Sequence, residues 1–252
     1  MIIDRFRIDG RVALVTGGTR GIGRAFVTAL AEAGADVAVA SRKPEKEFET
    51  YVRSLGRRYM HHQADLSRRE ETRLVVPAVT KVLGGVDILV NNAGVIRRCA
   101  AADYGEPEWD DTIELDLSAA FILSQAAGRL MLEKGRGKII NICSVLSFQG
   151  GINVMGYTAA KHGMAGLTRA LASEWAARGV NVNAIAPGYI ATELTEALQM
   201  DTQRSKALVD RTPAARWGQP YDLAGAVVFL ASPASDFVHG AILSVDGGWL
   251  VR

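Results

Sequence analysis

The chain has 252 residues, 48% of them hydrophobic, and a formal net charge of +2. This length is enough to bury one large core, and a small charge that is not concentrated in one basic block argues against nucleic acid or a membrane surface as a partner. No long apolar segment occurs near the N-terminus, so neither a signal peptide nor a membrane span is expected, and two cysteines fit a reduced, cytoplasmic compartment better than a disulfide scaffold.

The first predicted unit is a strand, a glycine turn and a helix. Residues 11–16 are mostly apolar and predict a buried strand, which leads directly into Gly17, Gly21 and Gly23. Apolar residues then recur at three- and four-residue steps from Ile22 to Ala33, as on one face of an α-helix. Glycines let a backbone approach a pyrophosphate, and a helix N-terminus offers it free N–H groups. The unit therefore predicts a dinucleotide site.

The residues after the second predicted strand, 36–40, bear on the choice of nicotinamide cofactor. A carboxylate at this place binds the ribose hydroxyls of NAD, whereas a cation accepts the 2′-phosphate of NADP. The sequence here is Ser41-Arg42-Lys43, and Arg20 in the glycine turn adds a further cation. Two neighbouring basic side chains can bind a phosphate through charge-assisted hydrogen bonds. NADP is therefore expected as the preferred cofactor, with NAD as the alternative.

Strands and helices alternate along the rest of the chain, a pattern typical of a parallel sheet with helices on both faces. Helices are predicted over residues 45–55, 68–83, 108–133 and 157–178, and further strands over 59–63, 88–91, 139–143, 180–185 and 241–245. We expect one doubly wound, Rossmann-like α/β domain over residues 1–252, with seven parallel strands. The polar segment 192–216 predicts one or two short helices, which would contact a polar substrate or form an ordinary surface helix.

Ser144, Tyr157 and Lys161 have the types and spacing of a proton-transfer site. Tyr157 and Lys161 are four residues apart in a predicted helix, so both side chains leave the same face. A nearby cation favours the phenolate form of tyrosine and lowers its pKa. Ser144 follows a predicted buried strand, at the edge where open α/β sheets bind ligands. A Tyr-x-x-x-Lys pair alone is more often a partly solvated surface pair, but the glycine turn favours a catalytic role.

The chain resembles the short-chain dehydrogenase/reductase family from Gly10 to about Gly248. Five motifs carry the resemblance in the family's order: Thr16-Gly17-x-x-x-Gly21-Ile22-Gly23, Asp65-Leu66, Asn91-Asn92-Ala93-Gly94, the Ser144, Tyr157 and Lys161 set, and Pro187-Gly188. The resemblance implies hydride transfer between a nicotinamide and a secondary alcohol or ketone. The terminal run 244–249 resembles the tetramer-forming end of the family, so a homotetramer is expected.

The resemblance also implies a role for each matched residue. Tyr157 would be the general acid in reduction and the general base in oxidation, Ser144 would hold the substrate oxygen, and Lys161 would bind the nicotinamide ribose. The predicted cofactor-binding residues are Gly17, Thr19, Arg20, Gly21, Ile22, Gly23, Ser41, Arg42, Lys43, Asp65, Leu66, Asn91, Asn92, Ala93, Gly94, Tyr157, Lys161, Pro187, Gly188, Ile190 and Thr192. His61-His62 has no acidic or cysteine partner at metal-ligand spacing, so no metal site is expected.

One position departs from the family pattern. A Trp-Asp-x-x-x-x-x-Asn run is usual in the long fourth helix, and here Trp109-Asp110 is followed by Asp116 in place of the asparagine. The family asparagine is thought to bend the helix and to hold a water through its main-chain carbonyl, which Asp116 can also supply. An ionised Asp116 would partly neutralise Lys161 and raise the pKa of Tyr157. Asp116 is therefore included among the catalytic residues, and an alkaline pH–rate profile is expected.

The substrate is implied by resemblance to the sugar-acid branch of the family, carried by residues 91–98, 146–152 and 216–218. A sugar acid of the 2-dehydro-3-deoxy-D-gluconate or 2-deoxy-D-gluconate type is expected. Arg97 or Arg98 could reach its carboxylate and Gln149 its hydroxyls, although surface positions or a subunit contact are equally consistent with both arginines.

Three other functions stay open. Gluconate 5-dehydrogenase and 3-oxoacyl-carrier-protein reductase activities use the same family machinery on other substrates. A dinucleotide-sensing regulator without catalysis would need no proton donor, so the presence of Ser144, Tyr157 and Lys161 argues against it.

Overall fold

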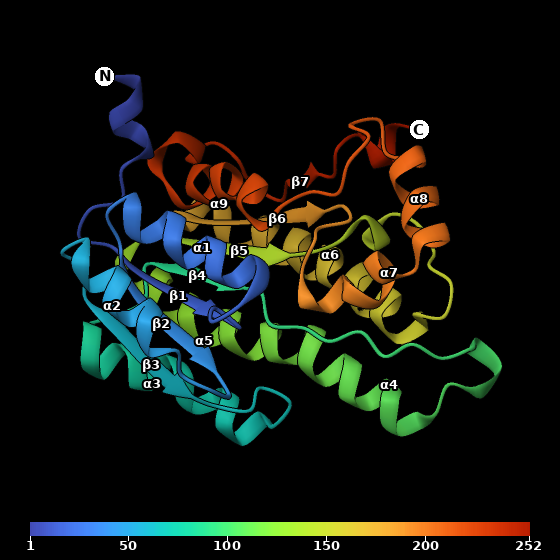
Figure 1. The fold of residues 1–252 in the computed structure, drawn as a ribbon. Helices are drawn as coiled ribbons and strands as arrows, with labels where there is room; N and C mark the ends of the chain where they lie inside the picture. The colour runs from blue at the N-terminus through green and yellow to red at the C-terminus, as the bar shows by residue number, and fades with distance from the viewer.

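A seven-stranded parallel sheet forms the centre of the computed structural model, which describes residues 1–252 (Figure 1). The strands are β1 (Val12–Thr16), β2 (Asp36–Ser41), β3 (Tyr59–Gln63), β4 (Ile88–Asn91), β5 (Gly137–Ile142), β6 (Val180–Pro187) and β7 (Ile242–Val245). Their order in the sheet is β3-β2-β1-β4-β5-β6-β7, and every pairing is parallel. The predicted fold class is confirmed.

Helices cover both faces of this sheet. α1 (Gly21–Glu32), α2 (Lys46–Ser54) and α9 (Ala224–Ala231) contribute to one hydrophobic cluster, and α3 (Arg69–Leu83), α5 (Ala119–Lys134) and α6 (Met155–Trp175) contribute to another. In Figure 1, α1 and α9 lie above the sheet and α3 and α5 below it. β1 and β4 are buried along their whole length, as expected for strands that are covered on both faces.

The sequence analysis does not predict α9. Its eight residues, Ala-Gly-Ala-Val-Val-Phe-Leu-Ala, are apolar or glycine throughout, so they show no alternation between an apolar and a polar face. The remaining short elements are 3-10 helices at Ile2–Phe6, Ala101–Asp103, Val145–Ser147, Ala176–Arg178, Glu193–Thr195, Pro220–Leu223, Pro233–Ser235 and Trp249–Val251.

The predicted long fourth helix is interrupted. α4 (Glu106–Ile113) is followed by a π-helical turn at Glu114–Ser118 before α5 begins, whereas the sequence analysis expects one helix over 108–133 with a local bend at the position of the family asparagine. A π turn holds one more residue than an α turn and is often found at functional sites. Here it contains the buried Asp116, so the local widening coincides with the position that departs from the family pattern.

The stretch Glu106–Lys134 is also long and apolar enough to cross a membrane, judged by length and composition alone. In the fold, however, α5 packs against α3 and the sheet, and its residues Leu123, Ala127 and Met131 belong to the core. Such a buried amphipathic helix needs no bilayer to cover its apolar face.

The strand order places a topological switch point between β1 and β4. Connections leave these neighbouring strands toward opposite sides, and open α/β sheets bind ligands in the resulting crevice at the carboxyl ends of the strands. The polar segment after β6 forms α7 (Glu196–Met200) and α8 (Thr202–Arg211), as predicted, and lies beside that edge of the sheet on the right of Figure 1.

Candidate active site

The turn between β1 and α1 allows a ligand to approach the backbone closely. Gly17 and Gly21 have φ angles of +63° and +52°, in the left-handed region that favours glycine. A Cβ atom on Gly23 would lie 2.2 Å from the carbonyl oxygen of Gly17 and 2.5 Å from Nδ2 of Asn92. The Asn92 amide donates to the Thr16 carbonyl oxygen over 2.9 Å. The turn is therefore fixed against the loop after β4, and no side chain fits at Gly23.

We expect Gly23→Ala to lower the free energy of unfolding by about 1–3 kcal/mol, because the new methyl group would clash with a backbone carbonyl. Gly166→Ala is the matched control: Gly166 lies inside α6 with no neighbouring atom within 4 Å of an added Cβ, so this variant should gain up to about 1 kcal/mol. Denaturant unfolding measures both values. A Gly23→Ala protein as stable as the parent would contradict the close packing of the turn.

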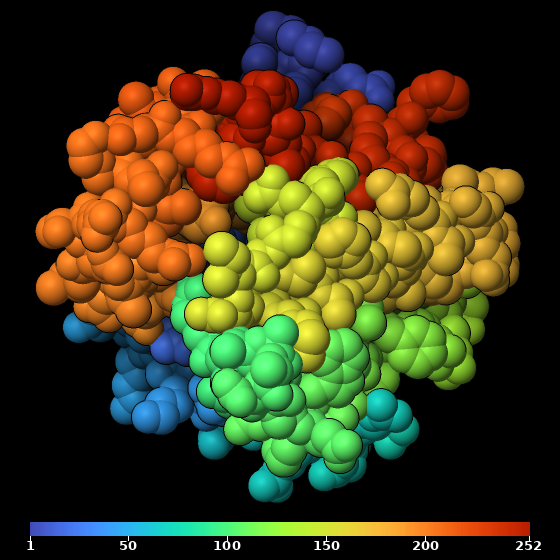
Figure 2. Space-filling model, turned by 90° about the vertical axis from the view of Figure 1, so that its right-hand side faces the viewer, coloured from blue at the N-terminus to red at the C-terminus, as the bar shows by residue number.

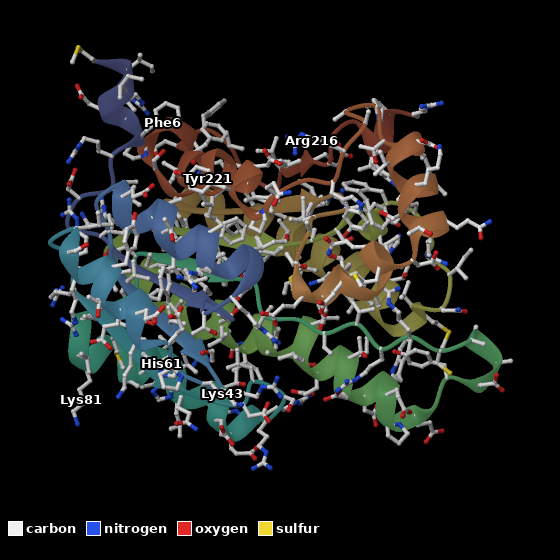
Figure 3. All side chains as sticks on the ribbon, viewed as in Figure 1. Phe6, Lys43, His61, Lys81, Arg216 and Tyr221 are labelled. Atoms are coloured by element: carbon white, nitrogen blue, oxygen red, sulfur yellow. The ribbon has the colours of Figure 1, made fainter.

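A pocket of about 410 Å³ lies beside the glycine turn. Its lining residues are Thr19, Arg20, Gly21, Arg24, Lys43, Pro44, Glu45 and Glu193. Lys43 has no carboxylate within 4.0 Å, and Figure 3 shows it at the carboxyl end of β2. Arg20 instead pairs with Glu193 over 2.7 Å, and Arg24 pairs with Glu45 over 3.2 Å. Lys43 is thus a free cation in this pocket, whereas Arg20 already has a carboxylate partner that the sequence analysis does not anticipate.

These features fit a dinucleotide. α1 begins at Gly21, and no side chain caps its first N–H groups, which therefore remain available to an anion. Thr192, at the start of the segment after β6, lies 3.5 Å from the position of a Cβ atom on Gly21, so this segment reaches the glycine turn. Arg42 is exposed, and its charge helps to hold the pKa of Asp65 below its usual value, after the larger effect of a hydrogen bond from Ser67.

Leu66 and Asn91, which are among the predicted cofactor residues, use their side chains inside the protein. Leu66 is buried in the core cluster under α3, so only its backbone could meet a ligand. The Asn91 amide donates to Ser124 and Asn141 over 3.0 and 2.8 Å in a buried network. The side chains of both residues hold the sheet and helices together, and the predicted contact of their backbone with the cofactor stays a prediction.

The rest of the predicted cofactor set lies along the same edge of the sheet. The Ser41 hydroxyl donates to the Lys43 carbonyl oxygen over 2.9 Å. The Ala93 N–H donates to the Thr16 hydroxyl oxygen over 2.9 Å, which holds the Asn91-Asn92-Ala93-Gly94 motif against β1. Pro187 ends β6, and Ile190 is buried just beyond it.

Ser144, Tyr157 and Lys161 come together at the carboxyl end of β5. The Lys161 ammonium nitrogen lies 5.3 Å from the centre of the Tyr157 ring and donates to the Ile142 carbonyl oxygen over 3.0 Å. The Ser147 hydroxyl donates to the Lys161 carbonyl oxygen over 2.8 Å, which ties α6 to the loop that carries Ser144. The four-residue spacing predicted from the sequence therefore places both α6 side chains beside the end of β5.

Asp116 reaches the same site from the π turn. Its Oδ2 lies 3.6 Å from the Lys161 nitrogen, and its Oδ1 accepts a hydrogen bond from the Val95 N–H over 2.7 Å. Its side chain has no exposed surface, and that of Lys161 is 4% exposed. A Cβ atom on Gly94 would lie 2.9 Å from Oδ2, so this glycine leaves room for the carboxylate. Asp116 and Lys161 thus form a buried ion pair.

Burial dominates the ionisation of these groups. It raises the pKa of Tyr157; the charge of Lys161 opposes this effect and the charge of Asp116 adds to it. Burial also raises the pKa of Asp116 to about 6, although Lys161 and the Val95 N–H lower it. Burial would lower the pKa of Lys161, but the charges of Asp116 and Tyr157 outweigh burial and raise that pKa. Asp116 thus acts on Tyr157 in the direction expected from the sequence, whereas Lys161 does not bring the pKa of Tyr157 below its usual value.

The predicted substrate residues separate into two groups. Both Nε and Nη2 of Arg97 donate to Asp111 Oδ2, over 3.0 and 2.6 Å, so Arg97 is already paired with a carboxylate, and its assignment to the substrate stays a prediction. Gln149 Oε1 accepts a hydrogen bond of 3.4 Å from Arg211 of α8. Arg98 has no carboxylate within 4.0 Å of its guanidinium.

Three aromatic residues form a cluster just beyond the end of β6. The ring of Tyr189 lies 6.0 Å from that of Trp217 and 4.6 Å from that of Trp249. Tyr189 follows Pro187-Gly188 directly, so its place after the end of β6 was available as a signal. Figure 2 shows a groove between the orange segment that contains α7 and α8 and the green and yellow segments near residues 100 and 150. No group of three or more histidine, cysteine or acidic side chains is arranged to hold a metal ion.

Comparisons with known proteins agree with this geometry. A family model described as enoyl-(acyl carrier protein) reductase matches residues 17–250. The chain is 49% identical over 253 residues to the 2-dehydro-3-deoxy-D-gluconate 5-dehydrogenase of Dickeya dadantii, and the match covers 100% of both chains.

Two solved structures are similar over nearly the whole chain. One, from Agrobacterium tumefaciens, is described as a 2-deoxy-D-gluconate 3-dehydrogenase with bound NADP; it has a TM-score of 0.93 and 50% identity and covers 98% of this chain and 99% of its own. The other is a gluconate 5-dehydrogenase from Burkholderia cenocepacia in complex with NADP and tartrate. It has a TM-score of 0.95 and 41% identity, with 100% of both chains covered.

Proposed function

We propose the following activity for this chain, which belongs to the short-chain dehydrogenase/reductase family: it is an NADP-dependent oxidoreductase that interconverts a secondary alcohol and a ketone of a sugar acid. One observation carries the proposal. Tyr157, Lys161 and Ser144 meet at the carboxyl edge of the sheet that also carries the glycine turn. A proton donor and a dinucleotide cradle are therefore side by side.

The names of the relatives support a sugar acid as the substrate. The Dickeya dadantii and Agrobacterium tumefaciens proteins are named for 2-dehydro-3-deoxy-D-gluconate and 2-deoxy-D-gluconate, and the Burkholderia cenocepacia structure holds tartrate, which is itself a hydroxy acid. We propose 2-dehydro-3-deoxy-D-gluconate as the substrate of this chain because that name belongs to a relative that aligns over its full length. Gluconate is the second candidate.

The chemistry divides between the cofactor and the chain. NADP, when bound, supplies or accepts the hydride. The Tyr157 hydroxyl gives its proton to the substrate oxygen during reduction, and the phenolate takes that proton back during oxidation. Ser144 lies at the end of β5 and donates a hydrogen bond to the same oxygen. Lys161 stabilises the phenolate by its charge, against the effects of burial and of Asp116.

Steady-state assays test this function. We expect the protein to oxidise 2-dehydro-3-deoxy-D-gluconate with NADP, and to do so with a higher kcat/KM than D-gluconate. A 3-oxoacyl thioester with NADPH is the control substrate for the acyl-carrier reductase alternative. Turnover of the thioester without turnover of either sugar acid would overturn the proposal. Binding of NADPH without turnover of any substrate would favour the alternative of a dinucleotide-sensing regulator without catalysis.

We expect the double substitution of Arg42 and Lys43 by alanine to lower kcat/KM with NADP at least about tenfold, because each charge-assisted hydrogen bond to a phosphate is worth about 1.5–3 kcal/mol. The value with NAD should change little, since NAD lacks that phosphate. Lys81→Ala is the matched control, because Lys81 is an exposed lysine of α3 that lies away from the pocket in Figure 3. Equal losses with NADP and NAD would contradict the assignment.

The remaining expectations are proposals about the protein as a whole. We propose that residues 1–252 form a single catalytic domain, that the protein acts in the cytoplasm and that it assembles as a homotetramer. Light scattering of the purified protein measures the last of these directly.

A further inference from the structure

His61 is a half-buried histidine of β3 to which the proposed function gives no role. Its Nε2 atom lies 2.9 Å from the hydroxyl oxygen of Ser41, at the end of the neighbouring strand β2. The same hydroxyl donates to the Lys43 carbonyl oxygen over 2.9 Å. Figure 3 shows His61 and Lys43 next to each other. Two hydrogen bonds therefore join His61 to the loop of residues 41–43, which carries the free cation of the pocket.

The strand register puts His61 on the same face of the sheet as this pocket. β2 and β3 are parallel, with Val39 opposite His61 and Ser41 opposite Gln63. Side chains alternate between the two faces along a strand, so Val39, Ser41 and His61 point to one face. Val39 packs in the core cluster to which α1 and α2 contribute, and residues at the start of α1 line the pocket. His61 thus approaches the loop from the pocket side.

The second hydrogen bond of Ser41 fixes the direction of the first. A serine hydroxyl has one proton, and Ser41 gives it to the Lys43 carbonyl oxygen, so Nε2 of His61 donates to the Ser41 oxygen. Burial and the charge of His62 lower the pKa of His61, and the opposing effects of the nearby backbone and of Glu49 are smaller. The ring is therefore neutral at pH 7, and its single N–H is the one that Ser41 accepts.

We propose that His61 is a positioning residue for the loop of residues 41–43 and that it thereby favours NADP over NAD. Through the Ser41 hydroxyl it fixes the backbone at Lys43, so the cations of Arg42 and Lys43 stay beside the pocket. The 2′-phosphate is the group that NADP has and NAD lacks, so only NADP gains from cations that are held in place before it binds. The inference rests on the proposed function for the binding of NADP at these cations.

Fluorescence titration of the whole protein with NADPH and NADH tests this role. We expect His61→Leu to raise the Kd of NADPH about 3- to 10-fold, as for the loss of one hydrogen bond, and that of NADH less than about twofold. His61→Gln keeps an N–H donor and should bind NADPH within about twofold of the wild type. His62→Leu is the matched control, because His62 is the next residue of β3, is also half-buried and points to the other face.

A double-mutant cycle tests whether His61 acts through Ser41. Ser41→Ala should weaken the binding of NADPH, and adding His61→Leu to it should change the Kd by less than about 1.5-fold, because the hydroxyl that joins His61 to the loop is already absent. Unchanged NADPH binding in His61→Leu, equal weakening of NADPH and NADH, a His61→Gln protein as weak as His61→Leu, or additive losses in the double variant would each overturn the proposal.

The titration needs no sugar acid, so its result is separate from that of the activity assays. Weaker NADPH binding in His61→Leu, with NADH binding unchanged, supports the positioning role even if the wild type oxidises no sugar acid, in which case only the proposed function fails. Turnover of 2-dehydro-3-deoxy-D-gluconate by the wild type, together with unchanged NADPH binding in His61→Leu, rejects the role of His61 and leaves the function intact.

Discussion

Tyr157→Phe is expected to lower kcat about a thousandfold, because proton transfer by a positioned acid or base contributes about 10²–10⁴-fold to a rate and phenylalanine has no proton to give. The ring itself is kept, so the contact with the Lys161 ammonium group, 5.3 Å from the ring centre, is not lost. The dissociation constant of NADPH, measured by fluorescence, should therefore change less than about threefold. The substitution should therefore slow the chemical step without weakening the binding of the cofactor.

Tyr51→Phe is the control for this experiment. Tyr51 lies on α2 and donates to Glu32 at the surface, so the same hydroxyl is removed from a tyrosine outside the site. Its kcat should match that of the wild type. If Tyr157→Phe kept more than about a tenth of the wild-type kcat, another group would have to supply the proton, and the assignment of Tyr157 would fall.

Asp116→Asn is expected to move the pH–rate profile for alcohol oxidation toward lower pH. Oxidation needs ionised Tyr157, and the negative charge of Asp116 raises the pKa of that phenol. Asparagine removes the charge, so the phenolate forms at lower pH and the ascending limb of kcat/KM shifts with it. Asparagine can still accept the hydrogen bond from the Val95 N–H, which preserves the packing of the π turn.

The pKa of Asp116 sets the pH range of this effect. Because that pKa is about 6, Asp116 is neutral below this pH, and the wild-type and Asp116→Asn rates should converge there. They should separate as the pH rises above about 6 and converge again where Tyr157 is ionised in both proteins. Asp110→Asn is the control, since it removes a charge from the exposed part of α4. Identical wild-type and Asp116→Asn profiles would show that Asp116 does not act on Tyr157.

The sequence predicted the elements of the fold correctly where a local pattern is compatible with only one structure. Apolar runs such as Val12–Thr16 form strands because both faces of a parallel sheet are covered, and Gly179, with a φ of +79°, ends the helical region that follows Tyr157. α9 was missed because an apolar segment without periodicity does not distinguish a buried helix from a strand. The family resemblance pointed to a bend at Asp116, but its form as a π turn was not predicted, because local sequence does not contain the packing of Asp116 against Gly94 and Lys161.

The sequence by itself determined the pair Tyr157 and Lys161, because a four-residue spacing on a helix puts two side chains on one face whatever surrounds them. It also determined the glycine turn, since only glycine accepts the backbone conformation and close contacts there. Only the tertiary structure decided which arginine is free and which carboxylate meets Lys161. Asp111 neutralises Arg97 and leaves Arg98 unpaired, and Asp116 approaches from a separate helix. Charge pairing between distant segments depends on distances through space, and these are set only when the sheet brings its loops to one edge.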